Sequence, residues 1–271
     1  MLLRPGLFRA ARLPPTGALH RAVLARRLYS SWGPSAGQAA SERWLYTILG
    51  LNTAVFAAWK YADNTIPLDL KASLSPETSR RIAQYVHLDK RQLFNDLYTH
   101  FVFKTDDPQR GRWWTTLTAA FSHKDLAHFI FNMFALKSFG EAIIAYCPRM
   151  GPSSFLTLYL GAGLAGSLGF YFQRQSQNSK QQSAAIGASG CVSGVAAAVA
   201  LIAPNAKWQI MFIPIGIPAW LLFSAYLAYD AIYLNDPNSR IGHSGHIGGA
   251  AWGAVYYWLV LRRLRSPLSR R

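Results

Sequence analysis

Cysteine is nearly absent from this sequence. Only Cys147 and Cys191 are present, both in or beside apolar runs, so neither a disulfide framework nor a four-cysteine metal site can form. Charged residues are also scarce, at 15% of 271 residues, below the roughly 25% usual for soluble domains. Together with a hydrophobic content of 51%, this scarcity favours a membrane protein over one large soluble domain.

Acidic residues are the scarcer of the two charged classes. The 12 Asp and Glu residues oppose 28 Lys and Arg residues, which gives a formal net charge of +16. The basic residues concentrate at the two ends of the chain, a pattern typical of targeting and membrane topology rather than of nucleic-acid binding. We therefore expect a lipid bilayer, and no nucleic acid, among the partners of this protein.

Residues 1–41 contain no acidic residue, and their arginines are interleaved with Leu, Ala, Ser and Pro. An Arg-rich, acid-poor segment of this kind is typical of a mitochondrial transit peptide, and no uninterrupted apolar core marks a secretory signal. We predict a disordered presequence over residues 1–41, cleaved near Tyr29, where Arg27-Leu28-Tyr29-Ser30 resembles a processing site. A disordered basic tail is the alternative.

Six apolar runs follow, and each is predicted to cross a membrane as a helix. They cover residues 44–61, 126–145, 155–172, 188–203, 208–234 and 245–261, and the fifth is interrupted by Pro214 and Pro218. The long polar stretch 62–112 is predicted to be a loop that is partly helical and partly interfacial. The expected fold class is therefore an all-α membrane protein, with residues 42–271 as one six-helix domain.

The distribution of basic residues predicts the orientation of these runs. Both arginine-rich tails lie on one side, together with Arg149 and Lys207 in short connections, and this side is expected to be the retained one. In the inner membrane of a mitochondrion that side is the matrix, so the loop 62–112 would face the intermembrane space. The second, fourth and sixth runs would then all enter from the intermembrane space.

Each of these three runs carries polar residues near its start. His128 and Asn132 are four residues apart and share one face of a helix, Ser189 opens the fourth run between glycines, and His246 begins the sixth. Taken alone, a serine between glycines is more often a helix-packing residue. Because polar groups within a bilayer usually face the bundle interior, we expect the three clusters to meet.

The chemistry of these side chains predicts an acyl-transfer site. A serine hydroxyl needs a base to become a nucleophile, so Ser189 is the candidate nucleophile and His246 the candidate base. The His128 ring and the Asn132 amide are candidate donors to an oxyanion. No acidic residue is expected near His246, which predicts a Ser–His dyad; Asp230 is interpreted as pairing with a polar neighbour near the end of its helix.

These residues resemble the signatures of the rhomboid intramembrane serine proteases, over about residues 44–262. The matching motifs are Ser122-His123 with His128 through Asn132, Gly187-Ala188-Ser189-Gly190, and His246-Ile247-Gly248-Gly249 with Gly253. The basic leader and Trp113-Trp114 are similar to the mitochondrial branch, the presenilin-associated rhomboid-like proteases. The sequence departs from bacterial relatives at Ser193, where they place an aromatic residue that packs against the catalytic histidine.

The resemblance implies a six-helix rhomboid bundle with the activity of a serine endopeptidase. It implies Ser189 as nucleophile, His246 as base, and His128 and Asn132 as oxyanion donors, acting on single-span proteins of the mitochondrial inner membrane. A catalytically silent rhomboid-like protein that binds membrane proteins is the alternative. No cofactor is expected, and no metal site is expected at His243 and His246, because no third ligand lies nearby in the sequence.

Overall fold

The computed structural model describes residues 35–63, 75, 77, 89–177, 183–210, 213–236, 239 and 241–265. The chain divides into two compact units, Met1–Ser35 and Ala36–Arg271, and the elements described below all belong to the second. Most of the predicted leader, including its processing site near Tyr29, lies outside the described residues, as does most of the stretch between residues 64 and 88.

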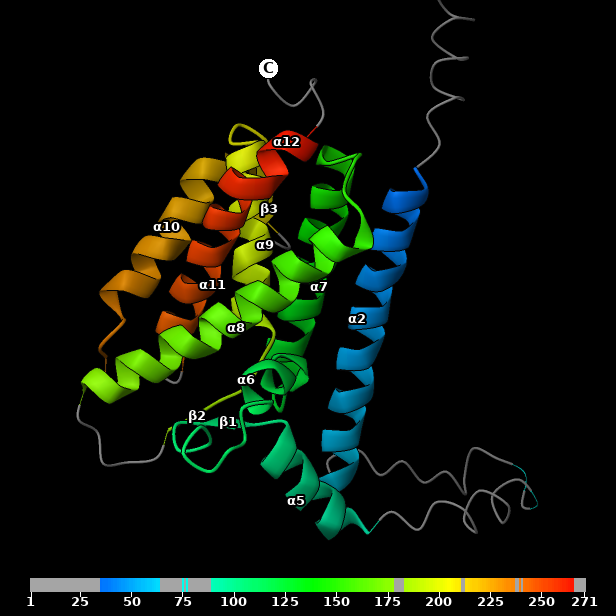
Figure 1. Cartoon of the computed structure of the whole chain (residues 1–271), viewed down its shortest axis with the longest axis vertical. Helices are drawn as coiled ribbons and strands as arrows, with labels where there is room; N and C mark the ends of the chain where they lie inside the picture. Colours follow the sequence, from blue (N-terminus) through cyan, green and yellow to red (C-terminus); the bar gives the residue numbers. More distant parts are fainter. Residues whose placement is uncertain are drawn as a thin grey trace, which may run out of the picture. The chain divides into compact units, whose positions relative to one another are not determined.

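The described part of the chain is mostly helical (Figure 1). Its longer helices are α2 (Ala36–Ala62), α7 (Leu126–Tyr146), α8 (Pro152–Ser176), α9 (Ser189–Ile202), α10 (Ala219–Ile232) and α11 (His243–Tyr256). After α11 the chain continues through a π-helical turn, Tyr257–Leu261, into α12 (Arg262–Leu264). The shorter helices are α5 (Lys90–His100), α6 (Thr115–Thr118) and a 3-10 turn, Ala119–Phe121.

The longer helices coincide in position with the predicted apolar runs. Among the described helices, α7 and α8 are each long and apolar enough to cross a membrane, whereas α9 and α10 are shorter apolar helices. The count of six membrane spans therefore stays a prediction. The loop between the first two runs contains a helix, α5, whose N-terminus is capped by the side chain of Asp89.

The first helix begins earlier than the start predicted from the sequence, Trp44. Helix α2 starts at Ala36, inside the predicted leader, and its residue Ser41 is fully buried. The Ser41 hydroxyl donates to the carbonyl oxygen of Gly37 at 2.9 Å and to that of Met150 at 3.3 Å. The folded unit therefore includes the last residues of the segment 1–41.

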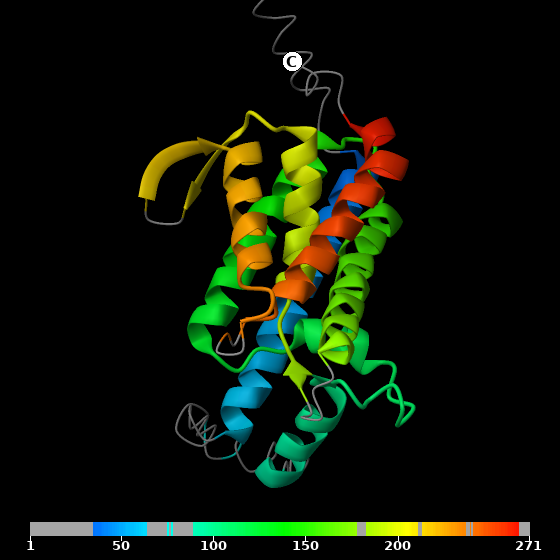
Figure 2. The ribbon, with the colours of Figure 1, turned by 90° about the vertical axis from the view of Figure 1, so that its left-hand side faces the viewer.

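The fold is mostly helical, as expected, but the first part of the predicted run 208–234, up to Pro218, is a pair of strands and not an interrupted helix. Strands β3 (Lys207–Ile210) and β4 (Ile213–Pro218) form an antiparallel hairpin, which Figure 2 shows reaching out from the bundle beside α10. Isoleucines favour strands, and Pro218 biases the residue before it toward the extended conformation, so the helix begins only at Ala219. A second short pair joins β1 (Phe103–Lys104) to β2 (Ala184–Ala185).

Helix α9 is deeply enclosed, and every residue from Cys191 to Ala200 is buried. It packs against α11 so closely that a Cβ atom on Gly249 or Gly253 would overlap a backbone carbonyl of α9. Small residues permit this approach between helices. Helices α7, α9 and α11 all begin at the end of the bundle where α5 and the β1–β2 pair lie (Figure 1), so their first turns are neighbours.

Candidate active site

The first turns of α9 and α11 bring Ser189 and His246 together. The Ser189 Oγ lies 2.9 Å from the His246 Nε2, although the two residues are 57 positions apart in the chain. Ser189 is the first residue of α9, and His246 lies in the first turn of α11. The close glycine packing between these helices sets this distance. A hydroxyl at this range can transfer its proton directly to the imidazole.

An acidic residue stands on the other side of His246, and the expectation that none lies there is wrong. Asp230, in the last turn of α10, places its two carboxylate oxygens 3.1 and 3.2 Å from the His246 Nδ1. Its side chain is only 1% exposed. The expected pairing of Asp230 with a polar neighbour near the helix end does occur, but the neighbour is the candidate base itself.

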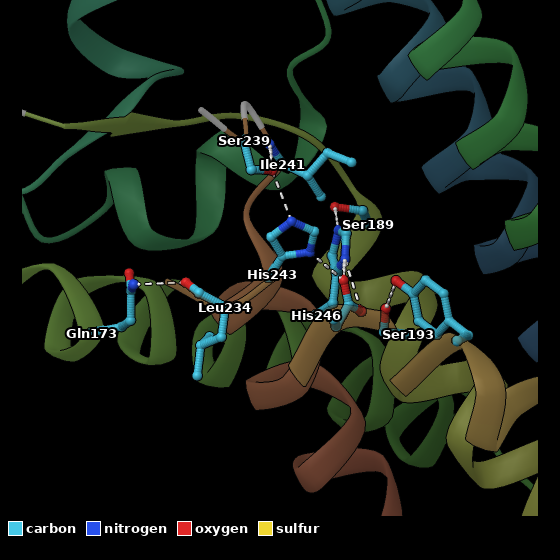
Figure 3. Close-up of polar contacts among 10 residues, drawn as sticks. Gln173, Ser189, Ser193, Leu234, Ser239, Ile241, His243 and His246 are labelled. Atoms are coloured by element: carbon cyan, nitrogen blue, oxygen red, sulfur yellow. Dashed lines mark hydrogen bonds and ion pairs between the residues drawn. The ribbon is translucent and has the colours of Figure 1, made fainter. Parts of the chain in front are cut away.

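The same carboxylate also contacts a second histidine, because the His243 Nδ1 lies 2.7 Å from the Asp230 Oδ1. On its other side, the His243 Nε2 lies 2.8 Å from the Ser239 hydroxyl (Figure 3). Ser189, His246, Asp230, His243 and Ser239 therefore form one continuous chain of hydrogen-bonding groups. Because Asp230 is held from two sides, its orientation toward His246 is fixed.

Asp230, His243 and His246 could also hold a metal ion, since their ligand atoms lie within 4.8 Å of one another. The expectation that the two histidines lack a third nearby ligand is therefore wrong. Two histidines and a carboxylate suit a divalent transition metal. The same atoms already make the hydrogen bonds described above, which account for their positions.

Tyr226 supplies an aromatic contact that the sequence analysis did not anticipate. It lies on α10, one turn before Asp230, and its ring centroid is 5.7 Å from that of His246. The Tyr226 hydroxyl lies 3.0 Å from the Ser193 Oγ. Ser193 thus anchors an aromatic ring contributed by a different helix. A tyrosine and an aspartate four residues apart on an apolar helix were the available sequence signal.

The two predicted oxyanion donors, His128 and Asn132, have different surroundings. The His128 ring lines the same cavity as Ser189 and His246, and it packs against Gly187, where a Cβ atom would lie 2.6 Å from the ring. Gly187 also has a positive φ of 124°, a conformation that favours glycine. The Asn132 amide instead donates to the His128 carbonyl oxygen at 2.9 Å, within its own helix.

His123 fixes the loop that leads into α9. It is fully buried, and its Nε2 accepts a hydrogen bond from the Ala188 N–H at 3.2 Å. Burial, with a smaller contribution from the nearby His128, lowers the pKa of His123 to about 3. The ring is therefore neutral at physiological pH, as an acceptor at Nε2 must be. His123 holds the backbone immediately before Ser189 and does not contact the hydroxyl.

A cavity of about 740 Å³ opens onto these groups. Its wall includes Ser189, His246 and His128, one face of α8, and the segments 183–187 and 239–242 within the described residues. A polar reaction centre at the wall of such a cavity is shielded from bulk solvent on several sides.

The chain matches the family model of the rhomboid domain over residues 110–263, which is more than half of its length. This protein belongs to the rhomboid family. The matched region of this rhomboid contains all the residues that surround the cavity. The groups that meet at Ser189 therefore lie within the domain that defines the family.

Relatives of this rhomboid carry mitochondrial names. It is 26% identical to Rhomboid protein 1, mitochondrial, of Saccharomyces cerevisiae over 227 residues, which are 84% of this chain and 56% of the yeast protein. It is 32% identical to RHOMBOID-like protein 12, mitochondrial, of Arabidopsis thaliana over 189 residues, 64% of this chain and 54% of the plant protein. It is 31% identical to human Presenilin-associated rhomboid-like protein, mitochondrial, over 163 residues, 57% and 40% of the two chains.

These relatives support a mitochondrial membrane location for the rhomboid described here. The chain spans about half the length of the curated relatives it matches.

Proposed function

We propose that this rhomboid is an intramembrane serine endopeptidase that cleaves single-span proteins of the mitochondrial inner membrane. The observation that carries the proposal is the 2.9 Å contact between the Ser189 hydroxyl and the His246 imidazole at the wall of the cavity. A serine in a merely structural role would not need a histidine that is itself held by a carboxylate. The contact supplies the nucleophile and the base of acyl transfer.

The proposed reaction proceeds through an acyl-enzyme. The His246 Nε2 takes the proton of Ser189 while the Ser189 Oγ attacks the scissile carbonyl carbon. The negative charge then forms on the carbonyl oxygen, where the Ser189 N–H, the His128 ring and the Asn132 amide act as donors. His246 returns its proton to the leaving amine, and a water molecule, activated by the same imidazole, hydrolyses the ester.

Asp230 acts in this scheme as a positioning residue. A carboxylate at the Nδ1 side keeps that nitrogen protonated, which leaves the Nε2 lone pair free to accept the serine proton. The carboxylate also stabilises the imidazolium that forms during the reaction. The proton transfer remains that of a Ser–His dyad, because Asp230 does not exchange a proton itself.

The proposed orientation places the cavity toward the intermembrane space and both chain ends in the matrix. Two observations support it: the arginine-rich tails favour the retained side, and the site lies near the first turns of α7, α9 and α11, away from the arginines of α12. This arrangement requires that the predicted helices span the inner membrane.

The test is cleavage of a single-span substrate by the purified protein in lipid. Ser189→Ala and His246→Ala should each lower the cleavage rate by about 10⁴-fold or more, because each removes a group that takes part directly in acyl transfer. Ser153→Ala, at an exposed serine of α8, is the matched control and should cleave like the wild type. Equal product from all these proteins would refute the proposal, and binding without cleavage by the wild type would support the catalytically silent alternative.

A further inference from the structure

One wall of the cavity ends in an arginine that the proposed reaction does not use. Along α8 the cavity is lined by Gly163, Gly166, Ser167, Phe170 and Arg174. The spacings of three and four residues place these positions on one face of the helix. Arg174 therefore continues the same wall toward the mouth of the site, in the last turns of α8.

The position of Arg174 relative to the reaction centre follows from helix geometry. At the level of Gly166, a Cβ atom would lie 3.4 Å from the Gly190 Cα and 2.8 Å from the Gly245 carbonyl oxygen, so this level adjoins Ser189 and His246. Arg174 lies eight residues further along, about 12 Å at 1.5 Å per residue. An extended peptide rises about 3.3 Å per residue, so Arg174 is within about four substrate residues of the scissile bond.

Among the described residues, the partners of the Arg174 guanidinium are uncharged. Its Nη1 donates to the Gln177 Oε1 at 3.2 Å, and the group lies 5.4 Å from the centre of the Phe170 ring. Its Nε is buried and has no hydrogen-bond partner among the described residues. A guanidinium has five N–H donors, and the described residues accept a hydrogen bond from one of them, so donors remain for a ligand that enters the cavity.

The charges around the cavity favour a negative ligand. None of the described residues that line it is Asp or Glu, and Asp230 is engaged behind His246. A carboxylate can accept two parallel hydrogen bonds from a guanidinium, which makes Asp or Glu the best-matched ligand.

We propose that Arg174 forms a subsite for an acidic side chain of the substrate, located within about four residues of the scissile bond. This inference rests on the proposed endopeptidase function, because the ligand is a residue of the cleaved protein. The subsite would make cleavage selective for membrane proteins that carry an Asp or Glu at one fixed position next to the cleavage site.

The experiment compares pairs of single-span substrates that differ only by Asp or Asn at one position. The pairs scan the four residues on either side of the cleavage site, and kcat/KM is measured for each. The wild type should prefer Asp over Asn by about tenfold at one position, as expected for a charge-assisted hydrogen bond. Arg174→Gln should remove this preference. Arg174→Glu should reverse it, so that a third substrate with Lys at the same position is cleaved faster than the Asp substrate.

Arg110→Gln is the matched control, because Arg110 is an exposed arginine paired with Asp106 outside the cavity. It should keep the wild-type preference. Equal cleavage of every Asp and Asn pair by the wild type, or a preference that survives in Arg174→Gln, would overturn the subsite.

A second measurement separates this inference from the endopeptidase proposal. The same substrate pairs are bound to the Ser189→Ala protein in lipid, and their affinities are compared with and without Arg174→Gln. An Arg174-dependent preference for Asp supports the subsite even if the wild type cleaves none of the substrates, an outcome that would refute only the proposed function. Equal affinities for Asp and Asn substrates would overturn the subsite alone.

Discussion

Two sets of groups surround Ser189: those around the candidate base His246, called the base side, and the candidate oxyanion donors, called the oxyanion side. The two sets differ in how completely hydrogen bonds link their members. On the base side, helices α9, α10 and α11 each contribute a group, and His246 lies within hydrogen-bond distance of both Ser189 and Asp230. On the oxyanion side, both candidate side-chain donors, His128 and Asn132, come from α7. The Asn132 amide is occupied by the carbonyl oxygen of His128, one turn earlier in the same helix.

This difference follows from when each group is needed in the proposed reaction. The base must meet the serine before attack, so its geometry can be built into the fold and held by the buried Asp230. The oxyanion exists only after attack, and donors to it gain most when they bind the transition state better than the ground state. An amide that leaves a local backbone acceptor for a developing charge fits this requirement.

The largest effect is expected at Asp230, which holds His246 on the base side. Asp230→Asn should lower kcat by about 10³- to 10⁴-fold with little change in KM, because an amide can hold His246 in the wrong tautomer. Asp96→Asn, at an exposed position of α5, is the control and should leave kcat unchanged. The measurement is steady-state cleavage in lipid, together with the unfolding temperature of each variant.

A purely structural role for Asp230 predicts a different result. The unfolding temperature would then fall in Asp230→Asn, and the residual activity of the folded fraction would match that of the wild type. This outcome would show that the base side is not held by Asp230 in its reactive geometry, and the difference between the base side and the oxyanion side would disappear.

The next largest effect is expected at Asn132. Asn132→Ala should lower kcat by about 10²-fold if the amide turns toward the oxyanion during the reaction. Asn52 on α2 offers a matched control, since its amide donates to the Ile48 carbonyl oxygen at 2.9 Å with the same four-residue separation, away from the cavity. Asn52→Ala removes an equivalent bond and should affect only stability. Equal losses of kcat in both variants would show that Asn132 is a helix-packing amide.

The sequence predicted those features of the fold that depend on the hydrophobicity of one continuous segment at a time. The apolar runs located the helices, and entry from one side placed Ser189 near His246. The hairpin was missed because isoleucine-rich residues 207–218 are as apolar as a helical span, and only their prolines and glycine indicate otherwise. The burial of Ser41 was missed because a basic leader and the start of a helix overlap in the sequence.

The polar partners of His246 could not be predicted for a different reason. Helix α10 is apolar around most of its circumference, so its sequence does not define which face meets α11. The rotation of this helix about its own axis decides whether Asp230 and Tyr226 face the base or lie elsewhere. That rotation is set by packing with α9 and α11, including the contact between Tyr226 and Ser193.

The smallest effect is expected at Tyr226. Two substitutions there distinguish the contribution of the aromatic ring from that of the hydroxyl. Tyr226→Leu should lower kcat by about tenfold, because the ring packed over His246 contributes about 1 kcal/mol to its position. Tyr226→Phe keeps the ring and loses only the bond to Ser193, so it should remain within about threefold of the wild type in kcat. Ser193→Ala removes the same bond from the other side and should match Tyr226→Phe. If the phenylalanine variant were as impaired as the leucine variant, the hydroxyl contact and not the ring would position His246, and the base side would depend on α9 as well as on Asp230.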